Sequence, residues 1–315
     1  MEYSISAGDT PLIGEIRRCI YELRNCILLA GSGLSAQAVT QRGEHPPSWK
    51  GLLAGMAEWC VRNRLIERTY AEALASLVAS GYLVEAGQEL DEILHESAAR
   101  QQCVKDVLHS NEITISKAHE HMAQIPFRGY LTTNYDNLIE AAFSKIKGRA
   151  LPAFYEASVD SVLHQYREEE CFILKLHGDV NDSGSIVLGD RSYERIRRNA
   201  DYRGCIATLF AMASILFVGF VGSDPDVDGL LSNVAAFDGR RVRHWMLVPS
   251  HQFPALKVKR LLKDRGVQVV EYEHDQTHSG LVGFLAALAP SPAAPARTLA
   301  TLESSALPEH DVSVR

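Results

Sequence analysis

The sequence lacks several features that mark common classes of protein. Its six cysteines form no C-x-x-C pair, which excludes the usual ligand spacing of a structural zinc site. It has no long basic run, and 39 acidic against 32 basic side chains give a net charge of −7, so binding to nucleic acid or to an anionic membrane surface is not expected. No signal peptide is recognisable, which predicts a cytoplasmic protein with reduced thiols.

One long uncharged run is the single candidate for a membrane span. It covers residues 205–221, CIATLFAMASILFVGFV, and is slightly shorter than the roughly 20 apolar residues that a span needs. The run contains Gly219 and continues into the polar GSDPD. This pattern favours a buried helix followed by a strand, and we expect no membrane association.

Short apolar runs, each ended by polar or glycine-rich residues, predict the strands. They are residues 26–31, 127–133, 171–178, 214–220, 243–249 and 267–273. Helical patterns lie between them, at 11–23, 117–124, 137–147, 254–263 and 279–288. The alternation predicts an α/β fold with a doubly wound parallel sheet of Rossmann-like type, covered by helices on both faces.

Two regions interrupt this alternation. Residues 50–110 are rich in alanine, leucine and glutamate, and they predict a group of helices inserted after the first strand–helix unit. Residues 181–203 are irregular apart from a charged helix at 193–198. We expect one domain over 1–289 and a disordered tail, rich in alanine, proline and serine, over 290–315.

The carboxyl ends of the strands are the place to look for a ligand, because doubly wound sheets bind ligands there. The first strand ends in Gly31-Ser-Gly33-Leu-Ser-Ala36, a G-x-G-x-x-A pattern that lets a backbone approach a pyrophosphate at a helix N-terminus. A tight turn alone would also explain these glycines. No acidic residue closes a second strand about 20 residues later, which disfavours a standard dehydrogenase.

Three further strand ends carry polar groups. Asn134 and Asp136 follow the second strand, where either could cap the next helix. His177 follows the third, either as a structural residue or as a group for proton transfer near neutral pH. Gly219 and Ser223 lie in a second loop of close approach, which also reads as an ordinary helix start. Four such ends in one sheet indicate a common ligand site.

Together these motifs resemble the sirtuin family. GSGLS is similar to the glycine-rich NAD loop, TTNYD to the T-Q-N-x-D motif, KLHGD to the catalytic H-G motif and VGFVGSDPDV to the late ribose-binding loop. Their order and spacing match over roughly residues 26–275. The similarity is greatest to a bacterial sirtuin-like branch that carries TTNYD and HGD and includes antiphage NAD-cleaving effectors.

The resemblance implies two catalytic residues. Asn134 would lie beside the nicotinamide ribose and hold the attacking water, and His177 would be the general base or the partner of a ribose hydroxyl. The remaining positions would bind NAD. They are Gly31, Ser32, Gly33 and Ser35 at the pyrophosphate, Asp136 at the nicotinamide carboxamide, and Gly219 and Ser223 at the adenosine ribose.

Two departures from the family concern its peptide-binding parts. Deacylating sirtuins carry four zinc-binding cysteines after the H-G motif, whereas only Cys205 lies in that interval here, so no zinc is expected. The family's G-I-P-D-F-R segment is replaced by RGEHPPSWKGLL, in which Pro47 and Trp49 alone echo the proline and the aromatic residue. Both differences disfavour binding of an acyl-lysine peptide.

The sequence therefore favours an NAD glycohydrolase, acting as a regulated NAD-depleting effector in bacterial antiphage defence. A sirtuin-type protein deacylase or ADP-ribosyltransferase is the first alternative, and a non-enzymatic NAD-sensing assembly module is the second. Because an enzyme that destroys NAD must be restrained, we expect a homo-oligomer or a regulatory protein partner.

Overall fold

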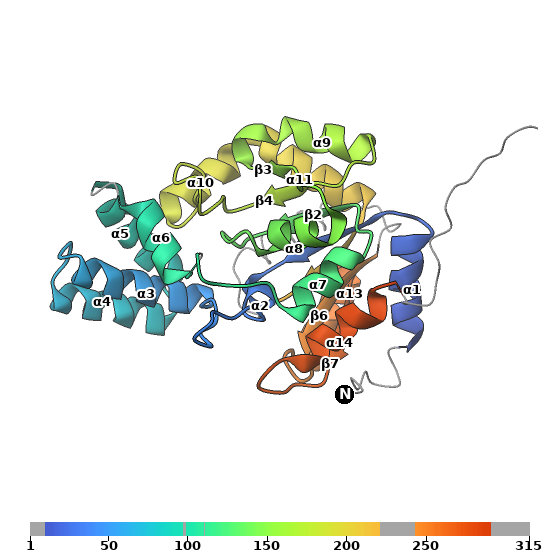
Figure 1. Cartoon of the computed structure of the whole chain (residues 1–315), viewed down its shortest axis with the longest axis horizontal. Coiled ribbons are helices and arrows are strands. Elements are labelled where there is room, and N and C mark those ends of the chain that lie inside the picture. Colours follow the sequence, from blue (N-terminus) through green and yellow to red (C-terminus); the bar gives the residue numbers. More distant parts are fainter. Residues whose placement is uncertain (1–9, 97–98, 110, 221–242, 291–315) are drawn as a thin grey trace, which may run out of the picture.

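A parallel sheet of seven strands organises the described part of the chain, which in the computed structural model comprises residues 10–96, 99–109, 111–220 and 243–290. The strand order is β3-β4-β2-β1-β5-β6-β7, with every neighbouring pair parallel. The strands are β1 Cys26–Ala30, β2 Gly129–Thr132, β3 Ala153–Phe154, β4 Ile173–Lys175, β5 Ser214–Val218, β6 His244–Pro249 and β7 Val267–Tyr272. The predicted doubly wound α/β sheet is confirmed (Figure 1).

All six predicted strands are present, and the sequence missed one. The missed strand, β3, has two residues at the edge of the sheet, too few to form an apolar run. The described helices are α1 Thr10–Tyr21, α2 Ser32–Ser35, α3 Trp49–Arg62, α4 Arg68–Ser80, α5 Leu83–Glu96, α6 Arg100–Val107, α7 Lys117–Gln124, α8 Leu138–Lys147, α9 Asp160–Arg167, α10 Asp190–Arg198, α11 Ala200–Met212, α13 Ala255–Arg265 and α14 Ser279–Leu288, with a 3₁₀ turn at Glu156–Ser158.

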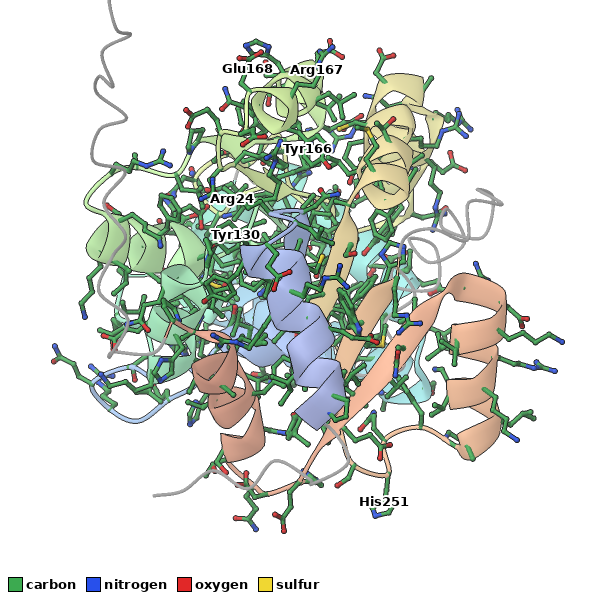
Figure 2. The ribbon with its side chains drawn as sticks, turned by 90° about the vertical axis from the view of Figure 1, so that its right-hand side faces the viewer. Arg24, Tyr130, Tyr166, Arg167, Glu168 and His251 are labelled. Carbon is green, nitrogen blue, oxygen red and sulfur yellow. The ribbon has the colours of Figure 1, made fainter. Side chains whose placement is uncertain are left out.

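Helices cover both faces of the sheet, which explains why its strands are apolar without alternation. In β1, Leu28 and Ala30 face a core shared with α1, α7, α8 and α14. Ile27 and Leu29 face the opposite core, shared with α9, α10, α11 and α13. Figure 2 shows this layering from the side, with α1 in front of the strands and with α14 and α13 on opposite sides of them.

The predicted helical insertion consists of α3, α4, α5 and α6, and it projects from one side of the sheet (Figure 1). It has a core of its own, which includes Trp59, Leu90 and Cys103. That core also takes in Tyr135 and Val180, which lie in the loops after β2 and β4. The insertion is therefore packed directly against the loops at the carboxyl ends of the strands.

The long uncharged run beginning at Cys205 divides into the end of α11 and the strand β5, as the sequence predicted. Among the described residues, no helix combines the length and the apolar character that crossing a membrane requires.

The order in which strands are added to the sheet reverses at β1. The strands β2, β4 and β3 lie on one side of β1, and β5, β6 and β7 lie on the other. At such a switch point the loops after neighbouring strands separate and leave room for a ligand. The loops after β1, β2, β4 and β5 carry the residues singled out in the sequence.

Candidate active site

A pocket of about 60 Å³ opens at the carboxyl ends of β1, β2 and β4. Five of the predicted site residues line it, namely Ser32, Ser35, Asn134, Asp136 and His177. Its volume is far below the several hundred Å³ of a typical site for a whole ligand, so this space suits one end of a dinucleotide. Of the other predicted residues, Gly31, Gly33 and Gly219 lie beside it, and Ser223 lies outside the described residues.

Asn134 joins the loop after β2 to the loop after β1. Its Nδ2 donates to the carbonyl oxygen of Gly31 at 3.0 Å and to the Oγ of Ser35 at 2.8 Å. Because a carbonyl oxygen only accepts, this contact fixes the orientation of the amide. The Oδ1 of Asn134 is then the atom of this side chain with capacity left for a ligand.

Asp136 is a buried carboxylate held from two sides. Its Oδ1 accepts from the backbone N–H of Leu138, the first residue of α8, at 3.1 Å, while Asn137 occupies the N-cap position without a side-chain cap bond. Its Oδ2 accepts from the Oγ of Ser35 at 2.7 Å. The hydroxyl of Ser35 therefore bridges Asn134 and Asp136, and its described partners are these two side chains.

His177 lines the same pocket from the loop after β4. Its ring packs edge-on against the ring of Tyr193, with centroids 5.5 Å apart. Gly178, which follows it, has a φ of +85°, and a Cβ there would lie 2.3 Å from the carbonyl oxygen of Ser185. The glycine of the HGD motif is therefore required by the backbone, because only glycine fits both this conformation and this contact.

The glycines of the first loop pack against the loop after β5, an arrangement that we call the glycine contact (Gly31, Gly33 and Gly219). The N–H of Gly33 donates to the carbonyl oxygen of Gly219 at 2.8 Å. A Cβ on Gly31 would lie 2.7 Å from the same oxygen, and one on Gly33 would lie 2.9 Å from it. The packing of two backbones thus explains these glycines without a ligand, and their predicted role in binding NAD stays a prediction.

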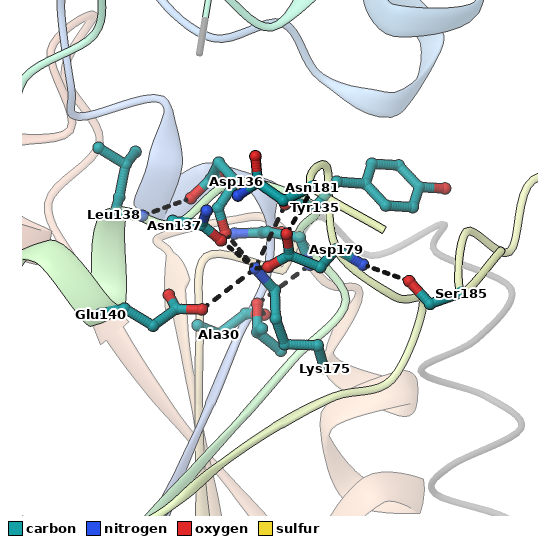
Figure 3. A network of polar contacts seen from close by, with 12 residues as sticks. Ala30, Tyr135, Asp136, Asn137, Leu138, Glu140, Lys175, Asp179, Asn181 and Ser185 are labelled. Atoms are coloured by element: carbon teal, nitrogen blue, oxygen red, sulfur yellow. Dashed lines mark hydrogen bonds and ion pairs between the residues drawn. The ribbon is translucent and has the colours of Figure 1, made fainter. Parts of the chain in front are cut away.

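A buried lysine below the pocket was not singled out in the sequence. The Nζ of Lys175 lies within hydrogen-bond distance of five acceptors (Figure 3). We call this group the lysine cage; its acceptors are the carbonyl oxygens of Tyr135 and Asp136 and the side chains of Asn137, Glu140 and Asp179. The signal was a lone lysine inside the apolar run CFILKLHG, since a strand covered on both faces must bury and pair such a residue.

The helical insertion supplies one wall of the pocket. Pro46, Pro47, Trp49, Leu52 and Leu108 line it from this side. The side chain of Trp49 packs on two of the hydrophobic cores and also borders the pocket. It meets the ring of Tyr193 edge-on at 6.5 Å. The aromatic pair closes the side of the pocket next to His177.

A second buried histidine, His119 of α7, lies near Asp136. The backbone N–H of Ser116 donates to its Nδ1 at 3.3 Å, which places the proton of the neutral ring on Nε2. Nε2 is buried without a described partner. Burial lowers the pKa of His119 to about 4, although the nearby Asp136 acts in the opposite direction, so this ring is neutral at pH 7.

The one charged side chain among the described residues that line the pocket is negative. Among the described residues that line it, Asp136 is a carboxylate, and none is a lysine or an arginine. In the described ranges, no three histidine, cysteine, aspartate or glutamate side chains are grouped as metal ligands. The arrangement offers a hydrogen-bond acceptor, an imidazole and a carboxylate around a small space, which suits cleavage of a bond that develops positive charge.

The fold and the site define a doubly wound α/β protein whose ligand site lies at the switch point of the sheet. Residues 128–270 match the family described as the SIR2-like domain. This stretch contains the TTNYD and KLHGD motifs and their two strands. Over these residues the chain is similar to the SIR2-like domain, and the resemblance seen in the sequence is confirmed at this level.

Several relatives carry the name NAD(+) hydrolase ThsA. The chain is 29% identical over 145 residues to that of Bacillus cereus (strain MSX-D12), covering 45% of this chain and 30% of the relative. It is 26% identical over 245 residues to that of Cytobacillus dafuensis, covering 77% and 44%. It is 25% identical over 170 residues to that of Enterococcus faecium, covering 51% and 32%. The chain thus spans less than half the length of each of these relatives.

Proposed function

We propose that this site hydrolyses NAD at the bond between nicotinamide and ribose. The observation that carries the proposal is the meeting of Asn134, Asp136 and His177 in one pocket beside the glycine loop. The SIR2-like domain and the relatives named NAD(+) hydrolase support it. The substrate would enter with its nicotinamide end, because the residues that the resemblance assigns to nicotinamide and its ribose line this pocket.

Asp136 binds the nicotinamide carboxamide in this proposal. Each of its oxygens accepts one described hydrogen bond, which leaves lone pairs for the carboxamide N–H groups. The carboxylate also stabilises the positive charge that grows on the ribose as the bond breaks, a requirement shared with glycoside hydrolysis. With no lysine or arginine among the described lining residues, that charge meets no repulsion at the pocket surface.

Asn134 and His177 activate the water. A water that donates to the Oδ1 of Asn134 is held beside the ribose, while the imidazole of His177 takes its other proton. The bond from the ribose carbon to the nicotinamide nitrogen breaks, a bond to the water oxygen forms, and the products are nicotinamide, ADP-ribose and a proton. General-base assistance of this kind contributes about 10²–10⁴-fold to the rate.

The other predicted positions extend the site beyond the pocket. Ser32 lies at its edge, and the backbone of Gly31 and Gly33 would meet the pyrophosphate on that side. Gly219 and Ser223 would border the adenosine ribose. In this arrangement the two halves of NAD are held by different loops, the nicotinamide half by the loops after β2 and β4.

Release of nicotinamide from NAD tests the proposal. Purified wild type, Asn134→Ala and His177→Ala are incubated with NAD alone, and the products are separated to distinguish linear from cyclised ADP-ribose. We expect release by wild type and a loss of about 100-fold or more in either variant. The exposed residues Asn111 and His164 provide matched controls, since Asn111→Ala and His164→Ala should keep the wild-type rate.

Two results would contradict the proposal. Full activity of His177→Ala would remove its role as base. Release that depends strictly on an acyl-lysine peptide would favour the deacylase reaction instead.

We further propose that this activity serves antiphage defence in the bacterial cytoplasm and is restrained by self-assembly or by a protein partner. The resemblance to a branch containing antiphage effectors supports this role. The measurement is the cellular NAD level after phage infection, in cells that express wild type or Asn134→Ala. We expect NAD to fall only with wild type and only after infection; depletion without infection would argue against restraint.

A further inference from the structure

Only 1% of the surface of Lys175 is exposed to solvent, yet this residue carries a charge. Its Nζ contacts the carbonyl oxygen of Asp136 at 2.6 Å and that of Tyr135 at 3.3 Å. It also contacts Asn137 Oδ1 at 2.7 Å, Glu140 Oε1 at 3.2 Å and Asp179 Oδ2 at 2.6 Å. An ammonium has three N–H donors, and five acceptors lie around this one, so every donor has an acceptor within reach.

The acceptors come from separate parts of the chain, which Figure 3 shows converging on one nitrogen. Tyr135, Asp136 and Asn137 belong to the loop after β2, and Glu140 belongs to the first turn of α8. Asp179 belongs to the loop after β4, two residues beyond His177. The lysine cage thus joins the loop that carries Asn134 and Asp136 to the loop that carries His177.

A second contact links the same two loops. The backbone N–H of Val180 donates to the carbonyl oxygen of Tyr135 at 2.9 Å, so this oxygen faces both Val180 and Lys175. Asp179 is fixed as well, because its Oδ1 accepts from the N–H of Asn181 at 2.6 Å and its own N–H donates to Ser185 Oγ at 2.9 Å. Removing the ammonium would leave the buried carbonyls and carboxylates without their shared donor.

The lysine remains charged in this environment. Burial by itself would lower the pKa of Lys175, but the carboxylates of Glu140 and Asp179 outweigh this effect and raise that pKa above its usual value. A permanently charged donor cannot act as an acid or base near neutral pH. Its contribution must therefore come from where it holds the surrounding atoms.

We propose that Lys175 is a positioning residue for the reaction: it sets the separation between Asn134 and Asp136 on one loop and His177 on the other. This inference deepens the proposed function, and its kinetic part rests on that function. It predicts that the geometry of the nicotinamide half of the site depends on Lys175. The geometry of the glycine contact, on the opposite side of β1, does not depend on this lysine.

Three variants of the cage and one control test this inference. Lys175→Met removes the charge, and Lys175→Arg keeps it but presents its donors in a plane that cannot match acceptors on all sides. Glu140→Gln weakens the cage at a partly exposed member, whose side chain is 19% exposed. Lys145→Met is the matched control, because Lys145 lies further along α8, is 59% exposed and pairs with Glu120 of α7.

Hydrogen exchange gives a readout that does not need activity. In Lys175→Met, we expect the exchange rates of the Val180 and Leu138 amides to rise at least about tenfold more than that of the Gly31 amide, which is bonded to Val218 O in the sheet and reports the general loss of stability. An equal increase at all three amides would show a general loss of stability and would overturn the positioning role. If Lys175→Met does not fold, Lys175→Arg and Glu140→Gln are measured in its place, with the same selective pattern expected.

Steady-state kinetics of nicotinamide release supply the second readout. Because a displacement of about 1 Å in a catalytic group costs about 100-fold, we expect kcat to fall about 100-fold in Lys175→Met and about tenfold in Lys175→Arg. KM should change by less than about threefold, since the pyrophosphate side is untouched. Lys145→Met should match wild type in both constants. Wild-type exchange and wild-type kcat in folded Lys175→Met would refute the inference.

The two proposals can fail separately. If wild type releases no nicotinamide but Lys175→Met shows the selective exchange at Val180 and Leu138, the cage positions the loops and the proposed reaction is wrong. If wild type releases nicotinamide and the folded cage variants do so equally well, the reaction stands and the positioning role falls.

Discussion

The glycine contact and the lysine cage hold the two sides of one pocket by opposite means. At the glycine contact, backbones approach so closely that a Cβ on Gly219 would lie 2.4 Å from the nitrogen of Leu34. At the lysine cage, a long side chain fills the space between two loops and satisfies their polar atoms. One side is fixed because side chains are absent, and the other because one buried charge is fully paired.

This difference predicts which kind of substitution disrupts each side of the pocket. The glycine contact should fail through any added atom, whatever its charge, because packed backbone cannot move aside. The lysine cage should fail through loss of charge, even when the replacement has a similar size. Substitutions of matched type on each side separate these two mechanisms.

Loss of the buried charge should have the largest effect on stability. Lys175→Met leaves the Oδ2 of Asp179 and the carbonyl oxygen of Asp136 buried without this donor, and breaking a buried pair in this way costs about 3–5 kcal/mol. Urea unfolding measures the loss. Lys145→Met, which removes an exposed pair, should cost about 1 kcal/mol or less. Equal losses in the two variants would show that the cage contributes no more than a surface ion pair.

Adding a methyl group at the glycine contact should cause the second-largest loss of stability. Gly219 has a φ of +79°, and an added Cβ meets backbone, so Gly219→Ala should lose about 2–4 kcal/mol from strain and overpacking together. Gly148 has a φ of +67° with open space around its Cβ position, so Gly148→Ala should lose only about 1 kcal/mol. Gly204 lies in α11 with open space, and Gly204→Ala should be stabilising by about 0.5–1 kcal/mol. A different order in urea unfolding would mean that close approach is not what requires Gly219.

Acid should lower the free energy of unfolding by a smaller amount, through His119, which lies near Asp136. Burial lowers the pKa of His119 to about 4, whereas an unfolded histidine titrates near 6.5. The unfolded state therefore binds the proton first, and the contribution to stability that is complete above pH 6.5 is lost as the pH falls towards 4. This linkage amounts to about 2 kcal/mol at pH 5.

The comparison is between wild type and His119→Phe, each unfolded in urea at pH 7 and at pH 5. Wild type should lose about 2 kcal/mol more than the variant between the two pH values. The same loss in both proteins would show that His119 takes up its proton in the folded state. Asp136 then has a charged neighbour, contrary to the neutral ring described above.

Removal of the Ser35 hydroxyl, which lies between Asn134 and Asp136, should cause the smallest change in stability. Ser35→Ala removes the acceptor of one side chain and a donor to the other, and groups buried without a partner cost about 1–3 kcal/mol. Ser144→Ala, on the exposed side of α8, should lie within about 0.5 kcal/mol of wild type. If the two variants unfold at the same urea concentration, the network across the loops adds nothing measurable.

The sequence was sufficient to predict six of the seven described strands and five of the residues that line the pocket. Strands buried on both faces leave long apolar runs, and each of the six runs ends at the edge where Ser35, Asn134 and His177 meet. The edge strand β3 was missed because two residues carry no pattern. Helix α9, at Asp160–Arg167, was missed for a related reason, since its eight residues are mostly polar.

Contacts between distant residues were beyond the sequence. The spacing of Gly31 and Gly33 indicated a ligand, but nothing in the pattern shows that both pack on Gly219, about 190 residues later in the chain. Lys175 is a charge in an apolar strand, a signal that was not used, and the pattern does not show that its partners come from the loops after β2 and β4 and from α8. Trp49 borders the pocket because the whole insertion folds back onto the loops, which is a consequence of tertiary packing.

A crystal structure of the His177→Ala variant with NAD would test the central claim most directly. The account predicts the nicotinamide carboxamide on Asp136, the ribose carbon facing the Oδ1 of Asn134, and the pyrophosphate along the glycine loop. NAD bound with its nicotinamide away from this pocket, or no NAD bound at saturating concentration, would contradict it.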